Sequence, residues 1–289
     1  MKHWLIAGGS GLIGQRLASH LQRRGDTVTI LSRNPKAEAR WDNLAEWVAK
    51  SDVIVNLAGE NLFGARWSPE VKQRLVSSRV DTTKAIVDAI RSVAQRPAVL
   101  ISASAVGYYG DRGQAELTED SAPSDDFLAR LCVDWEDAAK PAAALGVRVV
   151  APRIGVVLDA AGGAVEKMKL PFLLFGGGPL GSGRQFMPWI HADDLCRLFI
   201  WAAETPTVAG PLNATAPNPV TMTEFASAMG KALRRPSWFP VPGVLVNLVA
   251  GEASAAVLAS QRAFPRKAIN LGFEFEYPEV GPALTEVLG

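Results

Sequence analysis

Short apolar runs recur along the first half of the chain and predict buried strands. They lie at residues 4–7, 27–31, 52–56, 99–101 and 147–151. Each run has few polar positions, which is typical of strands that are covered on both faces of a sheet.

Amphipathic segments separate these runs and predict helices. Leu17 and Leu21 share one face of a segment from 11 to 24. A Ser-Pro-Glu start predicts a helix over 68–95, and a further helix is predicted over 127–145. Strands that alternate with helices indicate an α/β fold, a Rossmann-type doubly wound parallel sheet.

The pattern loosens after residue 152, where glycines and prolines crowd the chain. Helices are predicted at 193–204, 223–233 and 244–250. We therefore expect a Rossmann domain over 1–152, with a sheet completed by later segments. A smaller C-terminal substrate-binding lobe is expected over 153–289.

The turn between the first strand and the first helix has the spacing of a phosphate-binding loop. Glycines there permit a tight turn and let the backbone approach a pyrophosphate, and a helix N-terminus offers N–H groups to an anion. The alternative is an ordinary glycine-rich turn. The residues predicted to bind a dinucleotide here are Gly8, Gly9, Ser10, Gly11, Leu12, Ile13 and Gly14.

The ends of the next two strands refine the cofactor. No carboxylate stands where NAD-binding folds hold a ribose 2′-hydroxyl; Ser32 and Arg33 stand there instead. Because an arginine can bind a 2′-phosphate with two N–H groups, we predict NADP(H). The alternative is a solvated surface arginine. The segment Leu57, Ala58 and Gly59, which ends in two small residues, would let the dinucleotide pass close to the backbone.

Composition and charge exclude several classes of protein. The chain has 289 residues, of which 48% are hydrophobic, so it is not disordered. A formal net charge of +1 argues against a nucleic-acid or lipid partner. The apolar runs are shorter than a membrane span needs, and two cysteines and three histidines predict no disulfide scaffold and no metal site. We expect a cytoplasmic protein.

At this point the sequence resembles the extended short-chain dehydrogenase/reductases of the NAD-dependent epimerase/dehydratase kind. It is similar in particular to the subgroup called epimerase family proteins, which carry a short C-terminal domain of unknown function. The resemblance implies a Rossmann fold, NADP(H) binding, a substrate cleft in the C-terminal lobe and a possible homodimer. Besides the glycine turn, it rests on the segments at 56–59, 66–69, 78–83, 102–110, 152–153, 189–194 and 260–265.

The chain departs from this family at its catalytic pair. The superfamily uses Tyr-x-x-x-Lys on a helix, where the lysine charge lowers the pKa of the phenol. Counting back from Glu136 puts Cys132 at the lysine place and Leu128 at the tyrosine place. Cys132 itself is a poor substitute, because a free cysteine usually behaves as a small buried hydrophobe.

Other side chains are therefore candidates for the chemistry. Ser104 fits the family's serine position, and Tyr108 and Tyr109 follow it in the same loop. His191 is a further candidate proton donor, as is Glu60. Each of these also has a structural interpretation, such as a buried hydroxyl with a partner or a histidine that fixes a helix start.

Several further residues are expected on the cleft side. Arginines there could hold an anion, and tryptophans could stack a ring. Arg153 is assigned to the cofactor, although it could instead tie the lobes together. The predicted substrate contacts are Glu60, Trp67, Arg79, Gln185 and Trp189.

Two functions follow as hypotheses. The first is an NADP(H)-dependent oxidoreductase or sugar-nucleotide epimerase that acts on a small sugar-like or anionic molecule. The second is a catalytically silent NADPH-binding sensor or interaction protein, which the missing tyrosine and lysine favour.

Overall fold

One parallel sheet forms the centre of the molecule. The computed structural model describes residues 1–34 and 36–289. The sheet strands are β1 His3–Ala7, β2 Thr27–Leu31, β3 Val53–Asn56, β4 Val99–Ser102, β5 Ser104–Ala105, β7 Arg148–Ile154 and β12 Gly210–Ala214. They lie in the order β12-β7-β4-β3-β1-β2, with β5 paired to β7, and every pairing is parallel.

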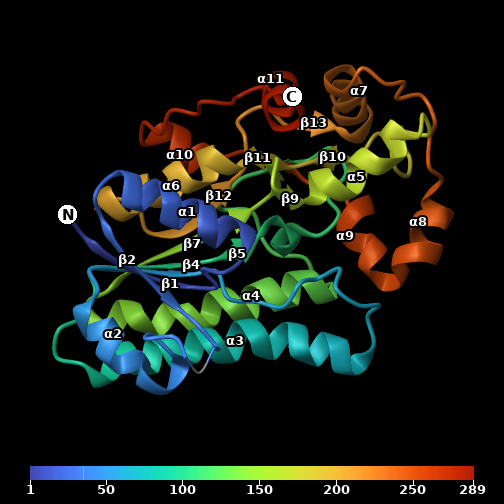
Figure 1. Cartoon of the computed structure of the whole chain (residues 1–289). Coiled ribbons are helices and arrows are strands. Elements are labelled where there is room, and N and C mark those ends of the chain that lie inside the picture. The colour runs from blue at the N-terminus through green and yellow to red at the C-terminus, as the bar shows by residue number, and fades with distance from the viewer. Residues whose placement is uncertain (35) are drawn as a thin grey trace.

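Helices cover both faces of this sheet (Figure 1). One layer holds α1 Leu12–Arg23 and α6 Ala192–Glu204, and the other holds α2 Leu44–Lys50, α3 Pro69–Ser92 and α4 Phe127–Ala139. Alternate strand residues point to opposite layers. Trp4 and Ile6 pack with α1 and α6, whereas Leu5 and Ala7 pack with α2 and α3. The predicted doubly wound α/β fold is confirmed.

Local sequence explains where the long helices begin and end. Ser68 Oγ accepts a hydrogen bond from the Val71 N–H at 3.3 Å, so α3 begins at the predicted Ser-Pro start. The predicted helix over 127–145 is divided, because α4 ends at Ala139 and the chain continues as the 3-10 helix η3 Lys140–Leu145. Pro141 accounts for the change, since it lacks the N–H that an α-helix needs.

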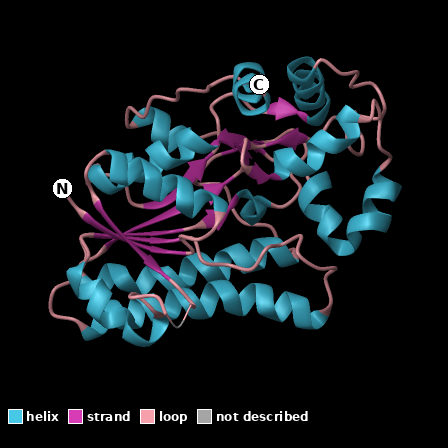
Figure 2. Ribbon diagram, viewed as in Figure 1, coloured by secondary structure: helices cyan, strands magenta, loops and turns pink. Residues whose placement is uncertain are grey.

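The smaller lobe lies over one end of the sheet, where Figure 2 shows short strands among helices. A sheet of β11, β8 and β9 packs with α7 and α11 around a second apolar core. The remaining elements are η1 Trp41–Asn43, η2 Val106–Tyr109, β6 Glu116–Leu117, β8 Val156–Asp159, β9 Gly162–Gly163, α5 Ala164–Leu173, β10 Phe186–Met187, β11 Trp189–His191, β13 Val220–Thr221, α7 Met222–Leu233, α8 Gly243–Ala250, η4 Gly251–Ser254, α9 Ala255–Leu258, β14 Arg262–Ala263, α10 Arg266–Asn270 and α11 Val280–Leu288.

The two parts of the chain are interleaved. Both α6 and β12 follow residue 152 in sequence, yet both belong to the sheet layer. The expected boundary at residue 152 falls inside β7. Among the described residues, no helix is both long and apolar enough to cross a membrane.

Candidate cofactor and substrate site

The turn between β1 and α1 has the tight geometry that its glycines predict. Gly8 has a φ of +78°, and a Cβ there would lie 2.7 Å from the backbone of Leu57. A Cβ on Gly14 would lie 2.5 Å from the Cα of Gly9. A larger residue at Gly14 would therefore push α1 away from the turn. One at Gly8 would push the turn away from the segment after β3.

The N-terminus of α1 is built to receive an anion. Gly11 caps the helix without a side chain, and its carbonyl accepts the Gln15 N–H at 2.9 Å. Within the described chain, no side chain caps the amides of Leu12, Ile13 and Gly14. These N–H groups and the positive end of the helix dipole suit a phosphate.

Arg33 follows β2 at the same edge of the sheet. Leu31 pairs with Ala7, so the glycine turn and Arg33 leave neighbouring strands side by side. Arg33 is exposed, and it forms no ion pair with any residue that the structure describes. Ser32 Oγ accepts the Asn34 N–H at 3.0 Å. A charged side chain without a partner at this edge fits a 2′-phosphate.

The segment after β3 completes this edge. Leu57 N–H donates to the Ala7 carbonyl at 2.8 Å, and Ala58 N–H donates to Asn56 Oδ1 at 3.2 Å. These bonds hold the segment against the glycine turn and leave Gly59 exposed. The structure therefore brings together the three predicted cofactor segments, at residues 8–14, 32–33 and 57–59.

Arg79, on α3, holds the segment after β3 in place through its side chain. Its guanidinium donates to the Glu60 carbonyl at 2.9 Å and to the Leu75 carbonyl at 3.1 Å. Arg79 is buried, and burial lowers the pKa of its guanidinium. Glu60, in turn, pairs with Arg74 at 3.3 Å. Since Arg79 is used internally, it positions the loop rather than offering itself to a substrate.

Ser104 belongs to a buried charged cluster. Its hydroxyl donates to Glu136 Oε1 at 2.7 Å. Glu136 also binds Arg153 with both oxygens, at 2.8 Å and 3.0 Å. Burial would lower the pKa of Arg153, but the hydrogen bonds that its guanidinium donates to the Glu136 carboxylate, with the charges around it, outweigh burial and raise the pKa. Arg153 thus joins β7 to α4, and the geometry shows no free face for the cofactor.

The two tyrosines of the same loop differ. The Tyr109 hydroxyl accepts from Arg153 Nη1 at 3.0 Å and donates toward Asn213 Oδ1 at 2.6 Å, and burial raises its pKa to about 12. The Arg153 guanidinium lies 3.4 Å from the centre of the Tyr108 ring. Among the residues described, the Tyr108 hydroxyl has no recorded hydrogen-bond partner, so it remains available.

The helix face that carries the catalytic pair in relatives is apolar here. Gly107 covers it, because a Cβ on Gly107 would lie 3.4 Å from Leu128 and 3.9 Å from the Cys132 sulfur. Cys132 is buried, and burial raises the pKa of its thiol to about 12. Neither side chain can exchange a proton with a substrate near neutral pH.

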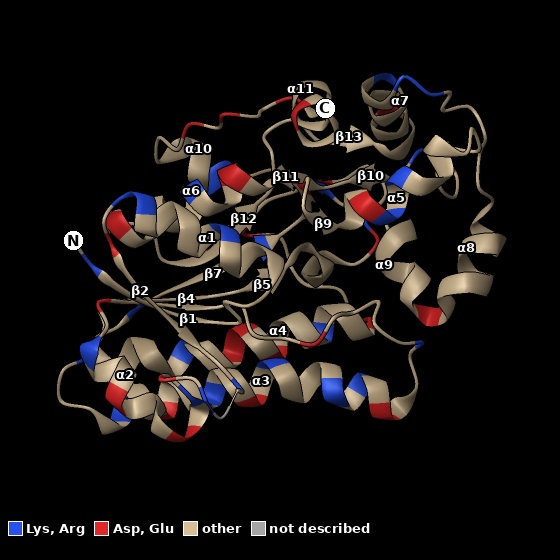
Figure 3. Cartoon of the chain, viewed as in Figure 1, with Lys and Arg blue, Asp and Glu red and all other residues tan. Residues whose placement is uncertain are grey.

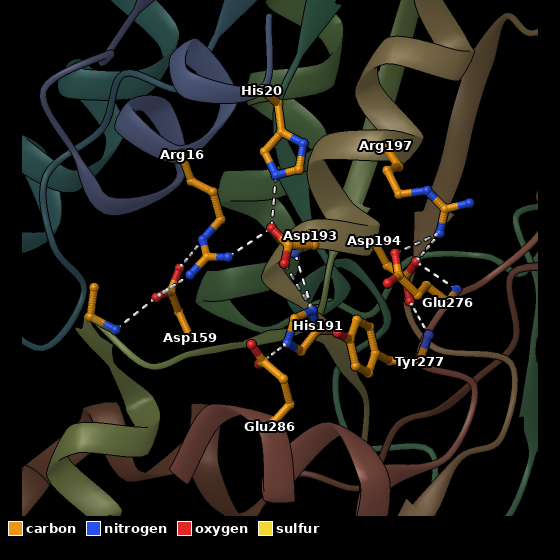
Figure 4. Close-up of polar contacts among 11 residues, drawn as sticks. Arg16, His20, Asp159, His191, Asp193, Asp194, Arg197, Glu276, Tyr277 and Glu286 are labelled. Carbon is orange, nitrogen blue, oxygen red and sulfur yellow. Dashed lines mark hydrogen bonds and ion pairs between the residues drawn. The ribbon is translucent and has the colours of Figure 1, made fainter. Parts of the chain in front are cut away.

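His191 lies in a separate polar network (Figure 4). Its Nε2 is 2.8 Å from Glu286 Oε2, its Nδ1 accepts the Asp193 N–H at 3.2 Å, and its ring stacks on Tyr277. The structure does not join His191 to Ser104 or to either loop tyrosine. We therefore assign His191 to the start of α6, not to proton transfer.

Two of the predicted substrate contacts are internal. Gln185 Nε2 donates to the Leu180 carbonyl at 2.8 Å, and Trp189 is buried in the core of the smaller lobe. Neither is among the residues that line the cleft at Trp67. The buried position of Trp189 follows from its place on β11, which both α7 and α11 help to cover.

Trp67, by contrast, lines a cleft of about 710 Å³. One wall is formed by η2 and the start of α4, and the other by α8, η4 and α9. The sequence did not predict that the second wall lines a cleft, nor that Glu136 binds Ser104 and Arg153. The glutamate could have been found, because its place relative to Cys132 was already noted, but nothing in residues 243–259 signals a cleft.

Comparisons with known proteins agree with this geometry. The model for the NAD dependent epimerase/dehydratase family matches residues 4–214, and that for a domain of unknown function, DUF1731, matches residues 241–287. The epimerase family protein YfhF of Bacillus subtilis is 39% identical over 98% of this chain and 97% of its own.

Two solved structures are also similar. The crystal structure of human epimerase family protein SDR39U1 with NADPH has a TM-score of 0.93 and 39% identity, and covers 99% of both chains. A protein from Corynebacterium glutamicum described as a nucleoside-diphosphate sugar epimerase has a TM-score of 0.81 and 37% identity. It covers 100% of this chain, which spans 58% of that one. This chain belongs to the NAD dependent epimerase/dehydratase family, with a DUF1731 domain at its C-terminus.

Proposed function

We propose that this protein is an NADP(H)-dependent oxidoreductase of the epimerase/dehydratase type that lacks the usual Tyr-x-x-x-Lys pair. The observation that carries the proposal is the meeting of the uncapped α1 N-terminus with the unpaired Arg33 at one sheet edge. The NADPH in the human relative's crystal supports it.

The chain's own residues divide the work of binding. The amides of residues 12–14 would bind the pyrophosphate, and Arg33 would bind the 2′-phosphate. The segment at 57–59 would let the dinucleotide pass close to the backbone. When bound, the dihydronicotinamide supplies a hydride for the reduction of a carbonyl group. Tyr108, whose ring packs on the Arg153 guanidinium and whose hydroxyl has no hydrogen-bond partner among the described residues, is the proposed proton donor to the carbonyl oxygen.

Cofactor choice is tested by Arg33→Ala, with Arg23→Ala at the far end of α1 as the control. Loss of charged hydrogen bonds to the 2′-phosphate costs about 1.5–3 kcal/mol, or roughly tenfold to a hundredfold in the dissociation constant of NADPH. Calorimetric titration should show this loss for NADPH and little change for NADH. Equal weakening of both cofactors would contradict the assignment.

The proton donor is tested by comparing Tyr108→Phe with Tyr109→Phe. We expect Tyr108→Phe to lower kcat for NADPH oxidation by about a hundredfold or more, with little change in melting temperature. Tyr109→Phe should mainly lower the melting temperature, because it removes a buried hydroxyl from Arg153 and Asn213. A Tyr108→Phe protein with full activity would exclude this residue.

A second candidate function is NADPH binding without turnover. The apolar pair Leu128 and Cys132, together with the engagement of Ser104 by Glu136, favours it. A panel of aldehydes, ketones and nucleotide sugars separates the two. Stoichiometric NADPH binding with no NADPH oxidation or epimer product across the panel would select the silent protein.

A further inference from the structure

The Trp67 cleft reaches the helix face where the family carries its catalytic tyrosine. Leu128, at the tyrosine place, lines it together with Gly107. A ligand in this cleft would therefore lie beside the expected position of the reacting atoms. The remaining lining residues are Gly110, Asp111, Asp126, Phe127, Asn247, Gly251, Glu252, Ser254, Ala255, Leu258, Ala259 and Gln261.

The walls of the cleft are largely apolar. Trp67 and Phe127 meet edge to face with ring centres 5.2 Å apart. The Trp67 indole N–H already donates to the Leu62 carbonyl at 2.8 Å, so that ring offers only its apolar surface. Across the cleft, Ala255 and Leu258 come from α9. Figure 3 shows that α8 and α9 carry almost no charged residues.

The charged groups that line the cleft are all carboxylates. They belong to Asp111, Asp126 and Glu252, and no lysine, arginine or histidine is among the lining residues. Each carboxylate also has a donor of its own. Asp111 accepts two backbone N–H groups, Asp126 caps α4 at 2.9 Å, and Glu252 pairs with Lys72.

Lys72 and Arg66 lie near the cleft without being among its lining residues. Lys72 is the partner of Glu252. Arg66 is exposed, and its Nε lies 2.9 Å from the position that a Cβ on Gly251 would take. An anion in the cleft would face three carboxylates, and no cationic side chain is among the lining residues, since Arg66 lies at the rim.

We propose that this cleft binds an uncharged, largely apolar compound and excludes nucleoside diphosphates. A diphosphate would lose its hydration beside carboxylates without gaining a cation. An apolar ring, however, gains contact with the aromatic pair Trp67 and Phe127 and with the aliphatic side chains of α9 opposite them. The inference rests on the proposed function in calling this ligand the substrate, and it replaces the sugar-like or anionic substrate expected from sequence.

The test uses two fluorescent probes with one anilinonaphthalene skeleton. N-phenyl-1-naphthylamine is uncharged, and 8-anilinonaphthalene-1-sulfonate carries one negative charge. We expect the uncharged probe to bind the full-length protein at least about tenfold more tightly. We also expect UDP and UDP-glucose to leave it bound. Titrations are run with and without NADP⁺.

Variants locate the probe and test the charge. Ala255→Trp fills the cleft and should weaken the uncharged probe at least tenfold. Val249→Ser, on the outward side of α8, is the matched control and should leave its affinity unchanged. Asp126→Asn keeps the helix cap but removes a charge, so it should strengthen only the anionic probe.

Three results would overturn the proposal. They are equal affinity for the two probes, displacement of the uncharged probe by UDP, or no effect of Ala255→Trp. If the anionic probe binds and Arg66→Gln abolishes its binding, the cleft is assigned to an anion held by Arg66. That result would also overturn the proposal. If NADP⁺ and NADPH do not bind while the probe selectivity holds, the cofactor assignment fails and the cleft assignment stands.

Discussion

At the scale of single residues, Glu136 holds the buried polar cluster together. It accepts from Ser104 and from two nitrogens of Arg153, which also contacts Tyr109. Ser104, which matches the family's serine position, is thereby hydrogen-bonded to a residue of a buried ion pair. Arg153, on β7, supplies the positive charge that compensates the buried Glu136 carboxylate.

Glu136→Gln should be strongly destabilising. It leaves the Arg153 charge buried without its carboxylate, a change that costs about 3–5 kcal/mol. For a chain of this size, the melting temperature should fall on the order of 10 °C. The control is Asp137→Asn, whose exposed pair with Lys140 should contribute less than about 1 kcal/mol. Equal melting temperatures for the two variants would show that the buried pair is not structural.

At the scale of elements, Arg16 of α1 connects the sheet domain to the smaller lobe. It binds Asp159 at the end of β8 at 2.8 Å and Asp193 at the start of α6 at 2.7 Å. His20 adds a contact to Asp193 at 2.8 Å. The helix whose N-terminus is predicted to hold the cofactor is thus tied to the smaller lobe through Arg16 and Asp159.

The Asp193 contacts predict a dependence of stability on pH. Burial alone would raise the pKa of the Asp193 carboxyl, but hydrogen bonds from Arg16 and His20 outweigh it and hold the pKa below its ordinary value of about 3.9. A carboxyl with a lowered pKa stabilises the fold above its unfolded-state pKa. That contribution is lost as pH falls through the folded-state pKa.

Asp193→Asn should therefore melt at a lower temperature than the parent protein at pH 7, and the difference should shrink below about pH 4. Melting curves at pH 7, 5, 4 and 3 measure it, with Asp137→Asn as an exposed control. A difference that stays constant over this range would mean that the Asp193 charge does not contribute.

At the scale of the whole molecule, the sheet domain is not formed by one continuous stretch of the chain. The segment from 192 to 214 returns to the sheet after the smaller lobe has begun, and residues 243–259 then close one side of the cleft. The Trp67 cleft is consequently built from both halves of the chain, whereas the three predicted cofactor segments all lie before residue 60. The homodimer that the family resemblance implies remains a prediction.

The sequence by itself determined the fold class, the glycine turn and the family. These features depend on short-range signals: apolar runs, helix starts, and glycines whose spacing suits one backbone path. Arg33 was predicted for the same reason, since it lies just beyond a strand whose end is predictable, and its contact with a 2′-phosphate stays a prediction. The comparisons confirm the family and the Rossmann-type sheet.

Only the tertiary structure decided what the polar candidates do. Ser104, Arg153 and Arg79 have sequence positions that suit catalysis or recognition, yet each is held by partners 17 to 32 residues away or by a neighbouring loop. His191 finds Glu286 across 95 residues. A side chain's free hydrogen-bonding capacity depends on which distant groups the fold brings within 3 Å, and sequence spacing does not contain that distance.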